Sequence, residues 1–124
     1  MISKLIKILY VVGTFLIINE IASLGDVLQF IDLSSFLIVA IPSLLAFVVG
    51  WFESKTTAIH CAFYSLIFSG ILGGIIGLIR TFSDATGDSV ILQAGMSVSL
   101  LPIFYGLSIA LLILPFYLMS KSAK

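Results

Sequence analysis

The sequence predicts an all-α integral membrane protein with four transmembrane helices. Of its 124 residues, 60% are hydrophobic and 10% are charged, and the mean hydropathy is +1.28. Soluble domains are about 45–50% apolar and about 25% charged. Because a soluble fold of this length buries only part of its apolar surface, the excess indicates a lipid environment. Short polar connections divide the chain into four apolar segments.

Each of the four segments is long enough to cross the hydrocarbon core, which takes about 20 residues of helix. The expected helices cover about residues 5–22, 33–52, 57–79 and 90–119, within a single transmembrane domain of residues 1–124. The first segment follows two lysines and resembles the start of a signal peptide, but no small-residue cleavage pattern follows it. The last two segments are long enough to tilt or to project beyond the hydrocarbon.

The basic residues predict that both termini face the cytoplasm. They lie at the N-terminus, in the second connection and at the C-terminus, as Lys4, Lys7, Lys55, Lys121 and Lys124. Arg80 is the exception, since it falls on the other side of the membrane, where most of the carboxylates also fall. The formal net charge is zero, so no overall field favours nucleic acid as a partner.

Small residues predict which helix faces pack together. Lipid tails are as apolar as leucine, so helices in a bilayer associate through close backbone approach and shared hydrogen bonds. The third segment carries Ser65, Ser69, Gly73 and Gly77 at four-residue spacing, with Gly70 and Gly74 beside them, and the fourth carries Gly95, Ser99, Pro102, Gly106 and Ala110. The first segment has few small residues and is expected to face lipid. Pro42, Pro102 and Pro115 each remove a backbone hydrogen bond and favour kinks.

No pattern in the chain predicts catalysis, a cofactor or a metal site, so an enzyme is not expected. His60 and Cys61 are neighbours on a helix and face different ways, and a zinc site typically needs four ligands. We interpret them as an interfacial histidine beside a buried thiol. Every charged residue lies at or near a helix end, whereas ion paths usually contain an ionisable residue within a span. The serines of the core either line a water path or hydrogen-bond between helices, and a proton path would need a carboxylate from a partner.

Three parts of the chain resemble a known family. Residues 30–39, which include Phe30, Asp32 and Ser35, resemble the start of the second helix of MotA-type flagellar stator proteins, with Ser34 in the place of a proline. Residues 70–79 resemble the glycine-rich third helix of the MotA/TolQ/ExbB proton-channel family. Residues 100–115, with Tyr105 and Gly106 at their centre, resemble its fourth helix.

This resemblance implies a homo-oligomeric ring, a pentamer, in the bacterial inner membrane. The ring would enclose the helices of single-span partners that carry an acidic residue, and proton or sodium flow would drive motion of the assembly. The third and fourth helices line the ring in this family. The candidate pore-lining or helix-packing residues are therefore Ser65, Ser69, Gly73, Gly74, Gly77, Ser97, Ser99, Pro102 and Gly106.

The chain also departs from the family pattern. The family usually has threonine where Gly74 stands, and one or two threonines where Pro102 and Ile103 stand, and these hydroxyls border the ion path. A turn at residues 53–55 replaces the large cytoplasmic segment that meets the flagellar rotor, so torque on a rotor is not expected from this chain alone. The alternatives are a non-conducting membrane scaffold or assembly protein with the same packing, and an unrelated four-helix protein. Conduction predicts serines at a central pore, whereas a scaffold predicts serines buried between helices.

Overall fold

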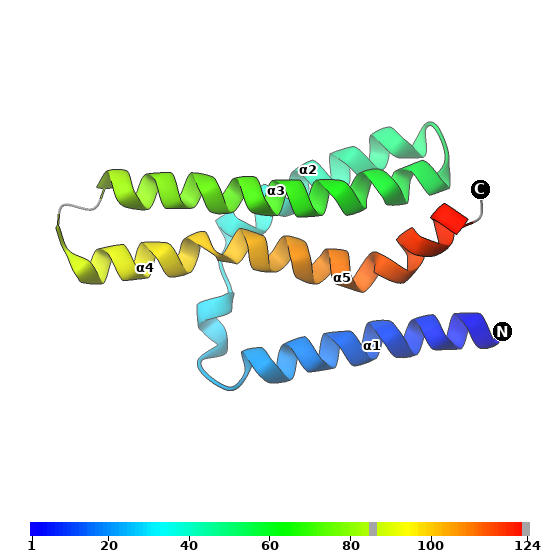
Figure 1. Ribbon diagram of the computed structural model, residues 1–124, viewed down its shortest axis with the longest axis horizontal. Coiled ribbons are helices and arrows are strands. Elements are labelled where there is room, and N and C mark those ends of the chain that lie inside the picture. Colours follow the sequence, from blue (N-terminus) through cyan, green and yellow to red (C-terminus); the bar gives the residue numbers. More distant parts are fainter. Residues whose placement is uncertain (85–86, 123–124) are drawn as a thin grey trace.

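The structure, a computed structural model, describes residues 1–84 and 87–122, and these residues form helices and no strand (Figure 1). The elements are α1 (Ile2–Ala22), the short 3-10 helix η1 (Val27–Phe30), α2 (Leu33–Trp51), α3 (Lys55–Asp84), α4 (Ser89–Ser99) and α5 (Leu101–Ser122). Four stretches are long and apolar enough to cross a membrane: Ile2–Ala22, Val27–Trp51, Lys55–Asp84 and Ser89–Lys121. The predicted fold class, an all-helical membrane protein with four spans, is confirmed.

The fourth span differs in detail from the single helix expected over residues 90–119. It consists of α4 and α5, which meet at Leu100. Pro102 explains the break, because proline donates no backbone N–H, its ring crowds the preceding turn, and it disfavours helical geometry in the residue before it. The third helix runs five residues beyond its expected end at residue 79, and its 30 residues exceed the roughly 20 needed for a span.

Helix α3 is the centre of the bundle, since α2, α4 and α5 all pack against it. A small core forms where α2, α3 and α5 meet, around Val39, Leu66 and Ala110. By contrast, α1 packs mainly on α5 and contains no buried residue. Figure 1 shows α1 separated from α2 and α3 by α5. The expectation that the first helix faces lipid agrees with this exposure.

Close packing joins α3 to α4 and α5 along what we call the glycine seam: Gly70, Gly73, Gly74 and Gly77 of α3 against Ser99 of α4 and Pro102, Ile103 and Gly106 of α5. A Cβ atom on Gly70 would lie 2.8 Å from the Pro102 carbonyl oxygen, and one on Gly106 would overlap the Leu66 carbonyl oxygen. Only glycine permits this approach, because the contact is between backbones. The small-residue stripes read from the sequence therefore meet one another.

A hydrogen bond between described residues links α1 to α5 and repairs a gap in α5. The Tyr10 hydroxyl donates to the Leu111 carbonyl oxygen at 2.7 Å. In an uninterrupted helix that carbonyl would accept from the residue four positions later, which here is Pro115 and has no N–H. A neighbouring helix thus satisfies the freed carbonyl, as an apolar environment requires.

Candidate functional site

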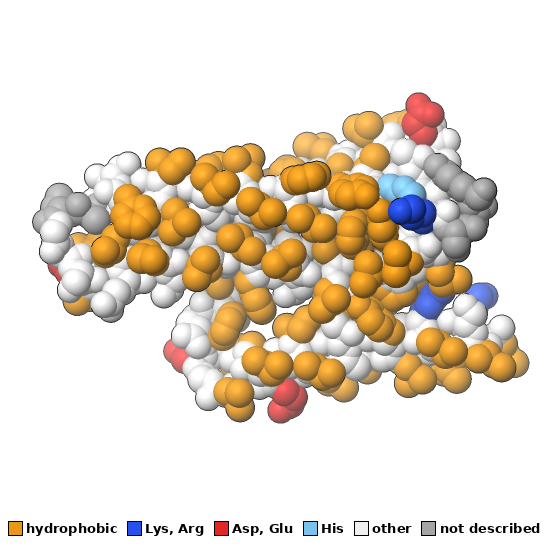
Figure 2. Space-filling view, in the orientation of Figure 1, with side chains coloured by type: hydrophobic (Ala, Val, Ile, Leu, Met, Phe, Trp, Pro, Cys, Tyr) orange, Lys and Arg blue, Asp and Glu red, His pale blue; other side chains and the backbone are white. Residues whose placement is uncertain are grey.

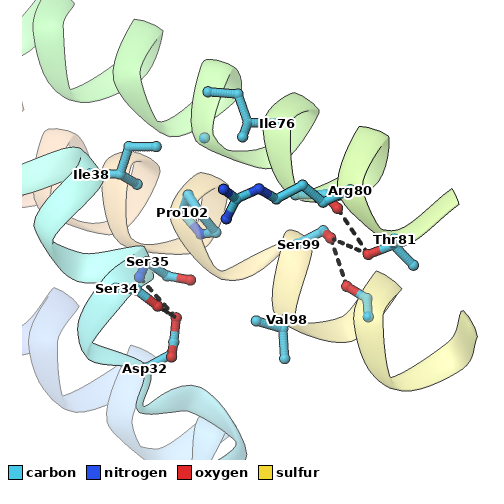
Figure 3. Close-up of a pocket in the computed structure, with 13 residues that line it drawn as sticks. Asp32, Ser34, Ser35, Ile38, Ile76, Arg80, Thr81, Val98, Ser99 and Pro102 are labelled. Atoms are coloured by element: carbon cyan, nitrogen blue, oxygen red, sulfur yellow. Dashed lines mark hydrogen bonds between the residues drawn. The ribbon is translucent and has the colours of Figure 1, made fainter. Parts of the chain in front are cut away.

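A cavity of about 260 Å³ is lined by both polar and apolar groups (Figure 3). The segments that line it lie in the half of the bundle away from both termini (Figure 1). We call it the Asp32–Arg80 cavity. Its walls come from the start of α2, from the second half of α3, and from α4 with the first turn of α5. Gly73 and Gly77 of α3 line the cavity, and the side chains of Pro102 and Ser99 pack against them. Its polar groups are two opposite charges and several hydroxyls.

Asp32 lies at the start of α2 because it caps that helix. Its carboxylate accepts hydrogen bonds from the backbone N–H of Ser35 at 2.8 Å and from the Ser34 hydroxyl at 2.9 Å. A side-chain oxygen in this position satisfies a backbone donor that the helix itself leaves free. The half-buried carboxylate therefore has a fixed place at the cavity wall.

Tyr105 of α5 holds the chain that leads into α2. Its hydroxyl accepts from the backbone N–H of Asp32 at 2.9 Å and donates to the carbonyl oxygen of Phe30. The ring packs edge-on against Phe36, with centroids 6.0 Å apart. The tyrosine hydroxyl thus both accepts and donates a hydrogen bond, as a phenol can. Both partners lie in the connection before α2, more than 70 residues earlier in the chain.

Arg80 enters the cavity from α3. Figure 3 shows its guanidinium extending along the helix to the level of Ile76 and Pro102, away from the end of α3. Helical side chains lean toward the N-terminus of their helix, which accounts for this direction. A guanidinium and a carboxylate on facing walls make a cavity that can hold water and a passing ion, because charged groups within a membrane face water or other polar groups.

Two of the candidate serines act in helix packing within the protomer. Ser69 is 9% exposed and donates to the Ser65 carbonyl oxygen at 2.6 Å, and Ser99 is 3% exposed and donates to the Gly95 carbonyl oxygen at 2.6 Å. Ser65 is half-buried, whereas Ser97 on α4 is exposed. Of the candidate serines, Ser97 is therefore the one open to a neighbouring chain or to a pore.

The remaining candidates, Gly73, Gly74, Gly77, Pro102 and Gly106, all lie in the glycine seam. Gly74 is the most informative, because the family usually has threonine at this position. A Cβ atom there would lie 2.6 Å from Cδ1 of Ile103 and 3.2 Å from the Ser99 carbonyl oxygen. In this chain the position packs against α5, and a larger side chain would require the Ile103 side chain to move.

Sequence reasoning missed several residues of the cavity as site candidates. Arg80 could have been identified as a site candidate, since it is the single basic residue on its predicted side of the membrane. Thr81 could also have been identified, because it continues the four-residue series of Ser65, Ser69, Gly73 and Gly77 along α3; its hydroxyl donates to the Gly77 carbonyl oxygen at 2.8 Å. Tyr105 does not line the cavity, but it holds the backbone of Asp32; the sequence does not indicate this role, since its partners lie far away in the chain.

His60 and Cys61 lie near the other end of α3, outside the cavity. Cys61 is half-buried. The His60 ring lies 4.8 Å from the Tyr117 ring, and its Nε2 atom is buried without a hydrogen-bond partner in the described structure. Within residues 1–84 and 87–122, no three His, Cys, Asp or Glu side chains come together in a metal-binding arrangement.

Comparison with known proteins gives one match. Residues 51–123 match the MotA/TolQ/ExbB proton channel family. The matched stretch holds α3, α4 and α5, and with them the whole glycine seam and Arg80. The resemblances noted for residues 70–79 and 100–115 lie inside it and are confirmed, whereas residues 30–39 lie outside it. No curated protein and no solved structure matches the chain.

Proposed function

The chain belongs to the MotA/TolQ/ExbB proton channel family, and from this premise we propose that it forms a homo-oligomeric ring around the transmembrane helix of a single-span partner. The ring lies in the bacterial inner membrane with both termini in the cytoplasm, and the family resemblance suggests five copies. Proton or sodium flow through it drives motion of the assembly. The chain has no catalytic role of its own.

The location of the carboxylates carries this proposal. All six Asp and Glu residues lie at helix ends or in connections: Glu20, Asp26, Asp32, Glu53, Asp84 and Asp88. A proton path through a bilayer needs an ionisable group within the membrane, and hydroxyls do not take up and release a proton near neutral pH. The partner helix therefore supplies the proton-binding carboxylate in the middle of the membrane.

The Asp32–Arg80 cavity serves as the outer entrance to this path. The positive-inside rule places the cavity in the outer half of the membrane. The Asp32 carboxylate raises the local concentration of cations. Arg80 on the facing wall keeps cation binding weak, and a conducting site must release its ion as well as bind it.

A non-conducting scaffold is the second candidate, and the burial of the serines favours it. The hydroxyl groups of Ser69 and Ser99 both donate hydrogen bonds to backbone carbonyls of their own helices. Gly74 lacks the hydroxyl of the threonine that borders the ion path in the family, and the Ile103 side chain packs against this position. A protein with these features can hold partner helices together without passing ions.

Proton flux into liposomes separates the two candidates. The protein is reconstituted alone and with the single-span membrane protein encoded beside it, and flux is followed with a pH-sensitive dye. Conduction requires both chains, and it is lost when the acidic residue in the partner's span is changed to its amide. Rings of identical subunits in particle images together with no flux in either preparation would leave the scaffold. A monomer or dimer in the particle images would overturn the proposed ring.

Two variants of this chain test the entrance. Asp32→Asn removes the charge at the cavity and is expected to lower flux. Glu53→Gln makes the same change of charge in the turn between α2 and α3, outside the cavity, and is expected to leave flux unchanged. Equal flux in both variants would show that the cavity is not the entrance.

A further inference from the structure

A groove of about 380 Å³ separates part of α1 from α5. This volume falls within the range of about 300–1,000 Å³ that small-molecule sites occupy. Its walls are almost wholly apolar, with Ile6 and Tyr10 on α1 facing Leu114 and Leu118 on α5. Polar groups occur near the start of α1, where Ser3 and Lys7 also line the groove.

The shape of α5 produces the groove. Pro115 lies in its wall, and α5 changes direction in its second half, so that its last turns lead away from the start of α1 (Figure 1). The hydrogen bond from Tyr10 to Leu111 holds the two helices together before this bend. The groove is thus fixed at one end and opens toward the termini.

Positive charge gathers at the open end. Lys7 lines the groove, Lys4 lies one turn or less away on α1, and Lys121 lies in the last turn of α5. Figure 2 shows the blue Lys and Arg side chains of this face at the end of the molecule that holds both termini. The Lys7 ammonium lies 5.5 Å from the centre of the Phe116 ring. This contact uses one face of the ammonium and leaves N–H donors for an anion, because the group has three.

The residues of the groove argue against a second protein helix as its occupant. Helices that pack tightly in membranes do so through small residues, whereas Ile6, Tyr10, Leu114 and Leu118 are all large. A second helix would also cover Lys7, and a charge buried in the membrane is costly without a partner. An acyl chain adapts to the irregular apolar walls, and a phosphate at its head neutralises the lysine.

We propose that the groove between α1 and α5 binds one anionic phospholipid, with an acyl chain between the helices and the phosphate at Lys7 and Ser3. Basic pockets between transmembrane helices are known to hold anionic headgroups. The lipid fills the space between the start of α1 and the second half of α5. It thereby fixes the position of a helix that packs mainly on α5.

Native mass spectrometry of the detergent-purified protein with equal amounts of phosphatidylglycerol and phosphatidylcholine tests the proposal. The first bound lipid should be phosphatidylglycerol by about fivefold, the preference that one basic residue near an anionic headgroup provides. Lys7→Gln should abolish this preference. Lys55→Gln, a control at the start of α3 and outside the groove, should keep it. An unchanged preference in Lys7→Gln, or an equal loss in both variants, would overturn the proposal.

Two further measurements identify the occupant. Leu118→Trp fills the groove and should reduce binding of both lipids, whereas Ile17→Trp, on an exposed part of α1 outside the groove, should not. A photocrosslinking residue in place of Ile6, used in vesicles that contain phosphatidylglycerol, should capture lipid. Capture of a second copy of this chain instead would show that the groove is a subunit interface and overturn the lipid site.

Discussion

Substituting Gly70 with alanine tests the glycine seam most directly. The new Cβ atom would lie 2.8 Å from the Pro102 carbonyl oxygen, whereas ordinary contacts begin at 3.4 Å, so α3 and α5 must separate by about 0.6 Å. Backbone atoms of a packed helix cannot turn aside as a flexible side chain can. Such overpacking typically costs about 1–3 kcal/mol, or about 5- to 150-fold in the unfolding equilibrium.

Gly13→Ala is the matched control, because a Cβ atom on Gly13 of α1 meets nothing within 4 Å. Both variants gain the same helix propensity, up to about 1 kcal/mol, so the difference between them isolates the packing cost. Unfolding is followed by the fluorescence of Trp51, the single tryptophan of the chain, as the detergent dodecyl sulfate is added to mixed micelles. Gly70→Ala should unfold at less dodecyl sulfate than Gly13→Ala. Stabilities that agree within about 0.5 kcal/mol would refute the close backbone contact, since that is the usual error of such comparisons.

Three further predictions concern single hydrogen bonds and one charge. Tyr105→Phe leaves the N–H of Asp32 without its acceptor, so hydrogen exchange at that amide should accelerate about tenfold, the equivalent of one net hydrogen bond; unchanged exchange would contradict the bond. Asp32→Asn should leave stability in the dodecyl sulfate titration nearly unchanged, because asparagine and aspartate cap helices about equally well, and a large loss would mean that the charge itself holds the fold. Tyr10→Phe should destabilise the protein by about 0.6–1.7 kcal/mol. That loss should disappear in a Pro115→Ala background, where the new N–H takes over the Leu111 carbonyl, and equal losses in both backgrounds would disprove the repair.

The number of spans and the family could be predicted from the sequence because both depend on local patterns. A run of about 20 apolar residues forms a helix in lipid wherever it packs, since its backbone groups must bond within the segment. The ends of the helices were less certain. Pro102 predicts a kink in the fourth span, but local sequence does not distinguish a bent helix from two helices that meet at Leu100.

The Asp32–Arg80 cavity was not predictable, because it depends on contacts between distant segments. Asp32 and Arg80 belong to different helices, and they line one cavity because α2 packs against α3. The hydroxyl of Tyr105 then fixes the connection before α2 through bonds that span 75 and 73 residues. No local pattern records which tyrosine meets which backbone group.

The sequence by itself determined that the chain has four membrane-spanning segments and that glycine and serine would mark their contacts. The tertiary structure decided which contacts these residues make: Ser69 and Ser99 are covered within the protomer, Gly74 lies against Ile103, and Ser97 stays exposed. The reason is physical. In water, apolar faces identify the core, but a lipid-facing and a buried helix face are equally apolar. Only the packed arrangement of the helices distinguishes them.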